Sequence, residues 1–226
     1  MQNIKEFNRG VVTVDPKNKT ATTVILLHGL GADASDLSSM SMYLQSSQEN
    51  IRFVFPNAPI LPVSLNGGVK MPAWFDILGL TEDSEQDEQG IHQAKIFIEA
   101  LVDHEHSRGI PCERIFLGGF SQGGALALYA GLHSAKKMGG VIGLSTYLPI
   151  ADKWSPTHTI SVYMAHGKVD PLVPLAWGKM AADHLRNCGC DVTWREYPIA
   201  HTICEEELLH LKQWLEERLN QNTGCL

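Results

Sequence analysis

Short apolar runs alternate along the chain with longer segments of mixed polarity. The run 24–27, Val-Ile-Leu-Leu, is apolar without alternation, which is typical of a strand covered on both faces. Six runs rich in β-branched or aromatic residues are predicted to be strands, at 22–27, 52–55, 114–120, 140–144, 160–165 and 191–197.

Between these runs lie four segments with helical periodicity, at 89–106, 122–135, 175–187 and 205–219. In the first of them, apolar residues fall on one stripe, as in an amphipathic helix: Ile91, Ala94, Ile98, Leu101 and Val102. Strands alternating with helices predict an α/β fold, with a mostly parallel central sheet flanked by helices on both faces. The Pro/Gly-rich stretch 57–79 is too long for a tight turn, so we interpret it as a functional loop. No linker divides the chain, and we expect one domain over residues 1–226.

Composition narrows the function classes. Of the 226 residues, 25 are acidic and 18 basic, giving a net charge of −7. Phosphate binding needs clustered Lys and Arg, so nucleic acid is not an expected partner. No apolar run approaches the roughly 20 residues of a membrane helix, and no signal-peptide pattern follows Met1. The five cysteines are odd in number and lack metal-site spacing, so we expect reduced thiols in a cytoplasmic protein.

The strongest chemical signal is Gly119-Phe120-Ser121-Gln122-Gly123, a G-x-S-x-G pentapeptide between a predicted strand and a predicted helix. A serine on so sharp a turn needs neighbours without bulky side chains, because strand and helix approach closely there. The turn also directs the positive end of the helix dipole toward a developing oxyanion. A glycine-rich turn with an incidental serine is the alternative, and the strand–helix context favours a nucleophile.

A serine nucleophile needs a base and an acid that orients it, and in this kind of fold they follow in the order Ser, Asp/Glu, His. Asp170 follows the strand 160–165, and His201 follows the strand 191–197. Both are therefore predicted at the same sheet edge as Ser121. Ser145 also ends a strand but lacks the glycine two residues on, and His166 is too close to Asp170 to serve the same serine. We predict a structural hydrogen bond for His166.

Other titratable residues are weaker candidates. Asp152 and Asp183 fall in a loop and a helix, where a solvated carboxylate is the usual state. No H-E-x-x-H pattern is present, and we expect neither a metal nor another cofactor. The oxyanion hole needs two backbone donors. Gln122 would supply one, and Leu30, in the turn His28-Gly-Leu-Gly31 after the first strong strand, the other.

Several motifs together resemble the acyl-protein thioesterases and small carboxylesterases, the phospholipase/carboxylesterase family. They run in the family's order across nearly the whole chain: Leu26-Leu-His-Gly-Leu-Gly31, Phe55-Pro-Asn-Ala-Pro59, Met71-Pro-Ala-Trp-Phe-Asp76, Gly118-Gly-Phe-Ser-Gln-Gly-Gly124, Asp170-Pro-Leu-Val-Pro174 and His201.

The resemblance implies a compact α/β-hydrolase without a large cap domain that needs no metal. Ser121, Asp170 and His201 fall on the family's triad positions, and Leu30 and Gln122 on its oxyanion donors. Family members can pair near the active-site mouth, which implies a weak homodimer as a further expectation. An acyl-chain groove is also implied, with these residues as its candidate walls, although ordinary core packing is an equal alternative for each: Met71, Trp74, Phe75, Tyr147, Leu172 and Val173.

Two departures bear on the substrate. Family members acting on lipidated proteins often carry an N-terminal cysteine, and Met1-Gln2-Asn3 offers none. Position 147 is tyrosine where animal members tend to have tryptophan. We therefore predict a serine hydrolase of short- to medium-chain acyl esters, with an acyl-protein thioesterase or a lysophospholipase as alternatives. A non-catalytic binding module on the same fold is a rival of another class. A peptidase is a third alternative, but the sequence shows no sign of the extra domain that usually selects peptides on this fold.

Overall fold

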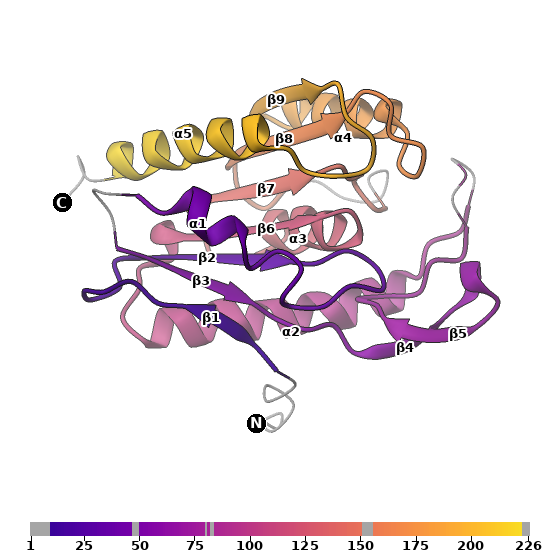
Figure 1. Ribbon diagram of the computed structural model, residues 1–226, viewed down its shortest axis with the longest axis horizontal. Coiled ribbons are helices and arrows are strands. Elements are labelled where there is room, and N and C mark those ends of the chain that lie inside the picture. The colour runs from indigo at the N-terminus through magenta and orange to yellow at the C-terminus, as the bar shows by residue number, and fades with distance from the viewer. Residues whose placement is uncertain (1–9, 47–49, 80, 82–83, 151–155, 223–226) are drawn as a thin grey trace.

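The computed structural model describes residues 10–46, 50–79, 81, 84–150 and 156–222. Its main sheet has seven strands in the order β1-β3-β2-β6-β7-β8-β9 (Figure 1). β1 pairs antiparallel with β3, and every other neighbouring pair is parallel. The strands are β1 (Val12–Val14), β2 (Thr22–Leu27), β3 (Ile51–Phe55), β6 (Ile115–Phe120), β7 (Gly140–Leu144), β8 (Ser161–Gly167) and β9 (Asp191–Tyr197).

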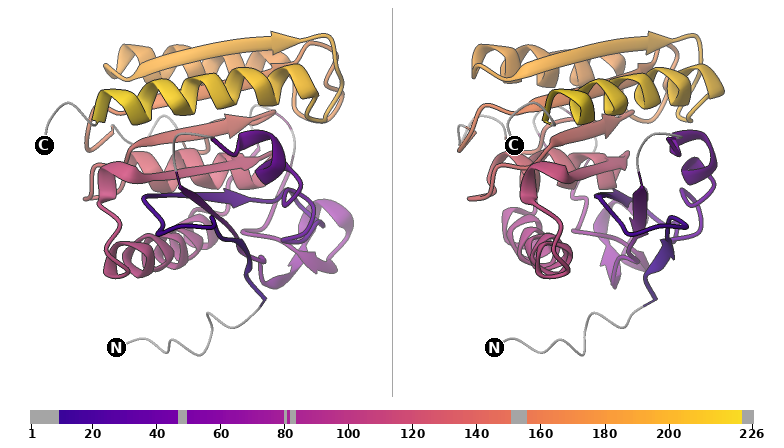
Figure 2. Two further views of the ribbon diagram at one scale, coloured as in Figure 1. Left: turned by 60° about the vertical axis from the view of Figure 1, so that its left-hand side comes forward. Right: turned by 90° about the vertical axis from the view of Figure 1, so that its left-hand side faces the viewer.

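Helices cover both faces of this sheet. Figure 2 shows α1 (Met40–Leu44) and α5 (Glu205–Asn222) on the side opposite α2 (Glu88–Ser107). α3 (Gln122–Leu132) and α4 (Leu175–Asn187) share the side of α2. The apolar sequence of β2 accounts for helices on both faces, because successive side chains of a strand point to opposite faces of the sheet. Ile25 and Leu27 join the apolar cluster under α2, α3 and α4, whereas Val24 and Leu26 join the cluster under α1 and α5.

A separate antiparallel hairpin, β4 (Ile60–Val63) and β5 (Val69–Pro72), lies beyond the end of β2 (Figure 1). A short turn of 3-10 helix, η2 (Ser64–Asn66), joins its two strands. The hairpin has a small apolar cluster of its own, made of Val63, Ala73 and Ile77, with Leu30, Leu61 and Met71 packed against it.

The predicted alternation of strands and helices, with helices on both sheet faces, is confirmed. All six predicted strands are present, and the four predicted helices form, although α3 ends at Leu132 rather than at 135. β1, α1 and the hairpin were not predicted, and the hairpin occupies the stretch that we interpreted as a loop. In the part of the chain that the structure describes, no helix is long and apolar enough to cross a membrane.

Candidate active site

Three predicted side chains meet where β6, β8 and β9 end. The Nε2 atom of His201 lies 2.9 Å from the Oγ atom of Ser121, and its Nδ1 atom lies 2.7 Å from the Oδ2 atom of Asp170. The carboxyl ends of parallel strands share one edge of the sheet, so residues far apart in sequence converge there. The structure therefore brings hydroxyl, imidazole and carboxylate into one hydrogen-bonded line.

Asp170 fixes the orientation of the imidazole. Its side chain is fully buried, and its Oδ1 atom accepts hydrogen bonds from the backbone N–H groups of Leu172 and Val173, each at 2.9 Å. An ionised carboxylate only accepts hydrogen bonds, so His201 carries its proton on Nδ1. The lone pair on Nε2 then faces the hydroxyl of Ser121, which is the arrangement that general-base catalysis needs.

His166 lies next to Asp170 and makes the structural hydrogen bond predicted for it. Its Nε2 atom lies 2.9 Å from the carbonyl oxygen of Val173 and 3.5 Å from the Oδ2 atom of Asp170. A carbonyl oxygen accepts, so Nε2 carries the proton. Burial lowers the pKa of His166 and so favours its neutral form. The residue holds the turn that carries Asp170.

The turn that carries Ser121 is strained and closely packed. Ser121 has φ 54° and ψ −121°, a region that L-residues rarely adopt and that is common at functional sites. A Cβ atom on Gly123 would lie 2.2 Å from the carbonyl oxygen of Leu27, so only glycine lets α3 begin so close to β2. The packing therefore confirms that the pentapeptide needs glycine where strand and helix approach closely.

Both predicted oxyanion donors lie on segments that flank Ser121. Gln122 is the first residue of α3, and the first N–H groups of a helix have no partner within the helix. On the other side, a Cβ atom on Gly29 would lie 3.4 Å from the Cβ atom of Ser121. This close approach places the turn that contains Leu30 beside Ser121.

Sequence reasoning missed how this region is braced. The side chain of Gln122 is buried, and it accepts a hydrogen bond from the Trp74 N–H at 3.0 Å and donates one to the Phe75 carbonyl at 2.8 Å. The indole N–H of Trp74 in turn donates to the carbonyl of His28 at 2.8 Å. These bonds connect the segment after β5 to the turn that carries Ser121 and to the turn after β2. The positions of polar residues along the sequence give no signal for hydrogen bonds between side chains and distant backbone groups.

His28 is a buried part of the same brace. Its Nε2 atom accepts a hydrogen bond from the Ala58 N–H at 3.0 Å, and its Nδ1 atom lies 2.8 Å from the Gly29 carbonyl. Accepting at one nitrogen and donating at the other requires a neutral ring. Burial lowers the pKa of His28 accordingly. Protonation would replace the bond to Ala58 with two opposed donors.

Phe120 is a further residue that sequence reasoning missed. Its ring centroid lies 4.7 Å from that of His201, with the planes tilted by 42°. Phe120 therefore packs directly against the imidazole. Its position directly before the serine of the pentapeptide is the signal that could have found it.

The predicted groove residues differ in exposure. Trp74, Phe75 and Val173 are buried, while Met71 and Tyr147 are partly buried, and Leu172 is 57% exposed. The Tyr147 ring makes an edge contact with Trp177, with centroids 6.1 Å apart. Buried members can shape a groove from beneath, whereas Met71, Tyr147 and Leu172 have surface with which a ligand can make contact.

The remaining candidates lie elsewhere. Ser145 is buried at the end of β7, and its hydroxyl has no hydrogen-bond partner. Asp183 forms an exposed ion pair with Arg186 at 2.8 Å, and Asp152 lies outside the described residues. Within the described ranges, no group of three or more His, Cys, Asp or Glu side chains is placed to hold a metal ion. Cys112, Cys188, Cys190 and Cys204 are free thiols, and Cys225 also lies outside the described residues.

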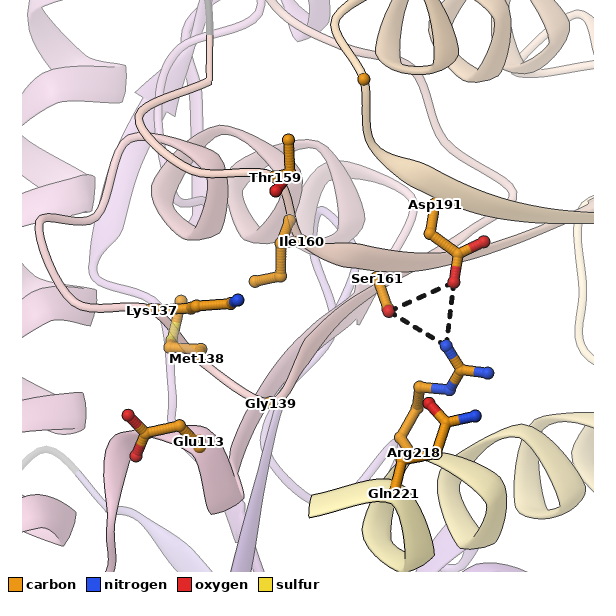
Figure 3. Close-up of a pocket in the computed structure, with 11 residues that line it drawn as sticks. Glu113, Lys137, Met138, Gly139, Thr159, Ile160, Ser161, Asp191, Arg218 and Gln221 are labelled. Carbon is orange, nitrogen blue, oxygen red and sulfur yellow. Dashed lines mark hydrogen bonds and ion pairs between the residues drawn. The ribbon is translucent and has the colours of Figure 1, made fainter. Parts of the chain in front are cut away.

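A cavity of about 520 Å³ occupies the opposite edge of the sheet, where β7, β8 and β9 begin (Figure 3). Arg218 reaches into it from α5 and donates to the Asp191 carboxylate at 2.8 Å and to the Ser161 hydroxyl at 3.1 Å. These bonds join α5 to the starts of β8 and β9. Two acidic side chains, Glu113 and Asp191, and two basic ones, Lys137 and Arg218, line the cavity. Ser121, Asp170 and His201 do not line it.

A serine, a histidine and a buried aspartate in line at the carboxyl edge of a mostly parallel sheet are the arrangement of an α/β-hydrolase. The fold is of this class, with no separate cap domain over the described part of the chain. A sequence model of the family described as Phospholipase/Carboxylesterase matches residues 8–219. The chain belongs to this family and is a serine hydrolase, as its motifs predicted.

The relatives support the same assignment. A protein named acyl-protein thioesterase 1 from Gibberella zeae is 39% identical over 212 residues, which cover 87% of this chain and 90% of that protein. Another of the same name, from Yarrowia lipolytica, is 35% identical over 221 residues, covering 93% and 97%. The crystal structure of Zea mays acyl-protein thioesterase 2 is similar with a TM-score of 0.83 at 29% identity, over 93% of this chain and 99% of that one.

Proposed function

We propose that this hydrolase cleaves acyl esters through a covalent acyl-enzyme, with Ser121 as nucleophile, His201 as general base and Asp170 as the residue that orients His201. The observation that carries the proposal is the pair of hydrogen bonds at 2.9 Å and 2.7 Å on the two sides of the His201 ring. A serine hydroxyl is a weak nucleophile until such a base accepts its proton.

The proposed reaction has two steps. His201 takes the proton of the Ser121 hydroxyl as its oxygen bonds to the acyl carbon, and the proton passes to the departing alcohol or thiol. Water then attacks the acyl-enzyme, giving a proton to His201, and the ester bond to Ser121 breaks with return of that proton to its oxygen. In both steps the N–H groups of Leu30 and Gln122 would bind the oxyanion, each worth about 3–4 kcal/mol of barrier.

For the acyl group, we propose short to medium chains. Three of the six groove candidates are buried, which leaves Met71, Tyr147 and Leu172 with surface for contact. A small apolar contact area favours a short acyl chain, because hydrophobic binding scales with the area removed from water. A second candidate is hydrolysis of acyl thioesters on proteins, favoured by the names of the relatives at 35–39% identity.

The catalytic assignment is tested with Ser121→Ala and with a fluorophosphonate probe, which labels an activated serine. Ser121→Ala is expected to lose at least about a thousandfold in kcat and all labelling. Ser145→Ala is the matched control, because it removes a nearby buried serine hydroxyl that has no partner. Full activity of Ser121→Ala, or equal losses in both variants, would contradict the assignment.

The acyl preference is tested by comparing kcat/KM for nitrophenyl esters of graded length, a palmitoylated peptide and a lysophospholipid. We expect a maximum among the short- and medium-chain esters. A kcat/KM for the palmitoylated peptide above that of every ester would establish the thioesterase instead. A maximum for the lysophospholipid would establish the lysophospholipase.

A further inference from the structure

Thr146 lies two residues beyond the end of β7, next to the nucleophile turn. It is 1% exposed, and its hydroxyl oxygen lies 2.7 Å from the carbonyl oxygen of Ser121. The same hydroxyl lies 3.4 Å from the carbonyl oxygen of Tyr147. A hydroxyl has one proton to donate, and the shorter contact is the stronger one, so Thr146 donates to Ser121.

The hydrogen bond from Thr146 is one of three that hold Ser121 in its strained backbone conformation. The N–H of Ser121 donates to the Leu144 carbonyl at 2.9 Å, and its carbonyl also accepts from the N–H of Ala125 at 3.0 Å. Leu144 ends β7 and Thr146 follows it, so this one chain segment holds Ser121 from both its N–H and its carbonyl side. Backbone in an unfavourable region persists only where the surroundings over-determine it in this way.

The carbonyl of Ser121 and the N–H of Gln122 belong to the same peptide group. A peptide group is planar and trans, so its C=O and N–H point in opposite directions. Whatever fixes the direction of the Ser121 carbonyl therefore fixes the direction of the Gln122 N–H. A hydrogen bond to the carbonyl also polarises the group and strengthens its N–H as a donor.

We propose that Thr146 is a positioning residue of the oxyanion hole, which acts by aiming the Gln122 N–H through the peptide it shares with Ser121. The inference rests on the proposed function, in which Gln122 is an oxyanion donor. The hydroxyl of Thr146 touches no reacting atom, and its effect passes entirely through the backbone.

The site is built to hold this threonine in one rotamer. A Cβ atom on Gly124 would lie 2.9 Å from the Cβ atom of Thr146, and one on Gly143 would lie 3.0 Å from its Cγ2 methyl group. Glycine at both positions leaves room for the side chain and no more. With its methyl group packed between them, the hydroxyl has no freedom to turn away from Ser121.

The test compares Thr146→Val, which has the same shape without the hydroxyl, with Thr146→Ser, which keeps the hydroxyl. Thr146→Val is expected to lower kcat about tenfold, the equivalent of one neutral hydrogen bond, with KM unchanged. The split is expected because the oxyanion contact forms in the transition state and not in the bound substrate. Thr146→Ser is expected to recover kcat to within about threefold.

Thr23→Val is the matched control for a merely structural loss. Thr23 is as buried as Thr146, and its hydroxyl donates to the Glu105 carboxylate at 3.0 Å, at the start of β2 and so at the far edge of the sheet. The same substitution there is expected to lower stability and leave kcat unchanged. A trifluoromethyl ketone, which forms a tetrahedral adduct on an active serine, gives a second measurement. Its affinity is expected to fall in Thr146→Val by the same factor as kcat.

Several results would overturn the inference. They are an unchanged kcat in Thr146→Val, an equal loss in Thr146→Ser, or an equal loss in Thr23→Val. Thr146→Ala is made alongside, because a smaller side chain cannot clash, and it is expected to show the same loss of kcat as the valine variant. If Ser121→Ala is inactive while Thr146→Val and Thr146→Ala are normal, the role of Thr146 fails and the proposed function stands. If Ser121→Ala is active, the proposed function fails first.

Discussion

Replacing Glu207 with glutamine measures how much a buried carboxyl destabilises this fold. Glu207 lies in the first turn of α5, is 1% exposed, and neither of its carboxyl oxygens has a hydrogen-bond partner of normal geometry. Burial raises its pKa from the ordinary 4.5 to about 7, with the backbone N–H of Cys204 opposing the rise. Glutamine has nearly the same shape and no charge at any pH.

The magnitude follows from the two pKa values. Below pH 4.5 the carboxyl is protonated in the folded and the unfolded chain, so its ionisation has no effect on stability. Between pH 4.5 and 7 the unfolded chain loses this proton first, and stability falls by about 1.4 kcal/mol for each pH unit. Above pH 7 the full penalty of about 3 kcal/mol is present. Glu207→Gln is therefore expected to match the parent near pH 4.5 and to exceed its stability by about 3 kcal/mol at pH 8.

Urea unfolding followed at several pH values between 4.5 and 8 gives the free energy of unfolding of both proteins. The urea dependence should be the same in both, so that the difference lies in the midpoint. At pH 8 the melting temperature of the variant should be higher by about 6–12 °C, as expected for a chain of this size.

Glu206→Gln is the matched control, because it removes the same formal charge from the neighbouring, exposed position of the same helix turn. It is expected to change stability by less than about 0.5 kcal/mol at each pH. A Glu207→Gln protein whose advantage does not grow between pH 5 and 7, or which is less stable than the parent at pH 8, would refute the reasoning.

Three further predictions concern the site and its surroundings. Stability is expected to fall as the pH drops below 6.5, because burial lowers the pKa of His28 and His166. Below pH 6.5 the unfolded chain takes up protons on these rings more readily than the folded chain does. Urea unfolding in the Glu207→Gln background measures this without the opposing effect of the carboxyl, and a stability that does not change from pH 6.5 to 5 would disprove it. Asp170→Asn is expected to lower kcat by about 10⁴, as in other triads, because an amide can present its N–H to His201 and select the wrong tautomer; steady-state kinetics with an ester measure it, and a loss below tenfold would remove Asp170 from its proposed role. Gly123→Ala is expected to abolish fluorophosphonate labelling, since its Cβ would lie 2.2 Å from the Leu27 carbonyl and overpacking displaces α3; normal labelling would contradict the close approach.

The sequence predicts the main sheet and its helices well, because their signals are local. β2 is apolar at every position, and α2 has a stripe of apolar residues at helical spacing. The hairpin was interpreted as a loop because Pro62 and Pro72 lie within its strands and Gly67 and Gly68 join them, and proline and glycine are poor signals for strands. β1 is three residues long and α1 five, too short for either periodicity to show.

The meeting of Ser121, Asp170 and His201 could be predicted because a parallel sheet brings the ends of its strands to one edge. The brace made by Gln122 and Trp74 could not. It consists of side-chain bonds to backbone groups about 47 residues away, and no spacing rule connects such positions. The same holds for the Thr146 hydroxyl, whose acceptor is a backbone carbonyl on another strand end.

The hairpin is physically linked to the turn that would hold the oxyanion. Leu30 packs against the small apolar cluster of the hairpin, and the N–H of the next residue, Gly31, donates to the Pro72 carbonyl at 2.8 Å. The position of β5 and the position of the Leu30 turn are therefore coupled by direct contacts. Under the proposed chemistry, the hairpin supports the oxyanion hole and also carries Met71 of the candidate groove.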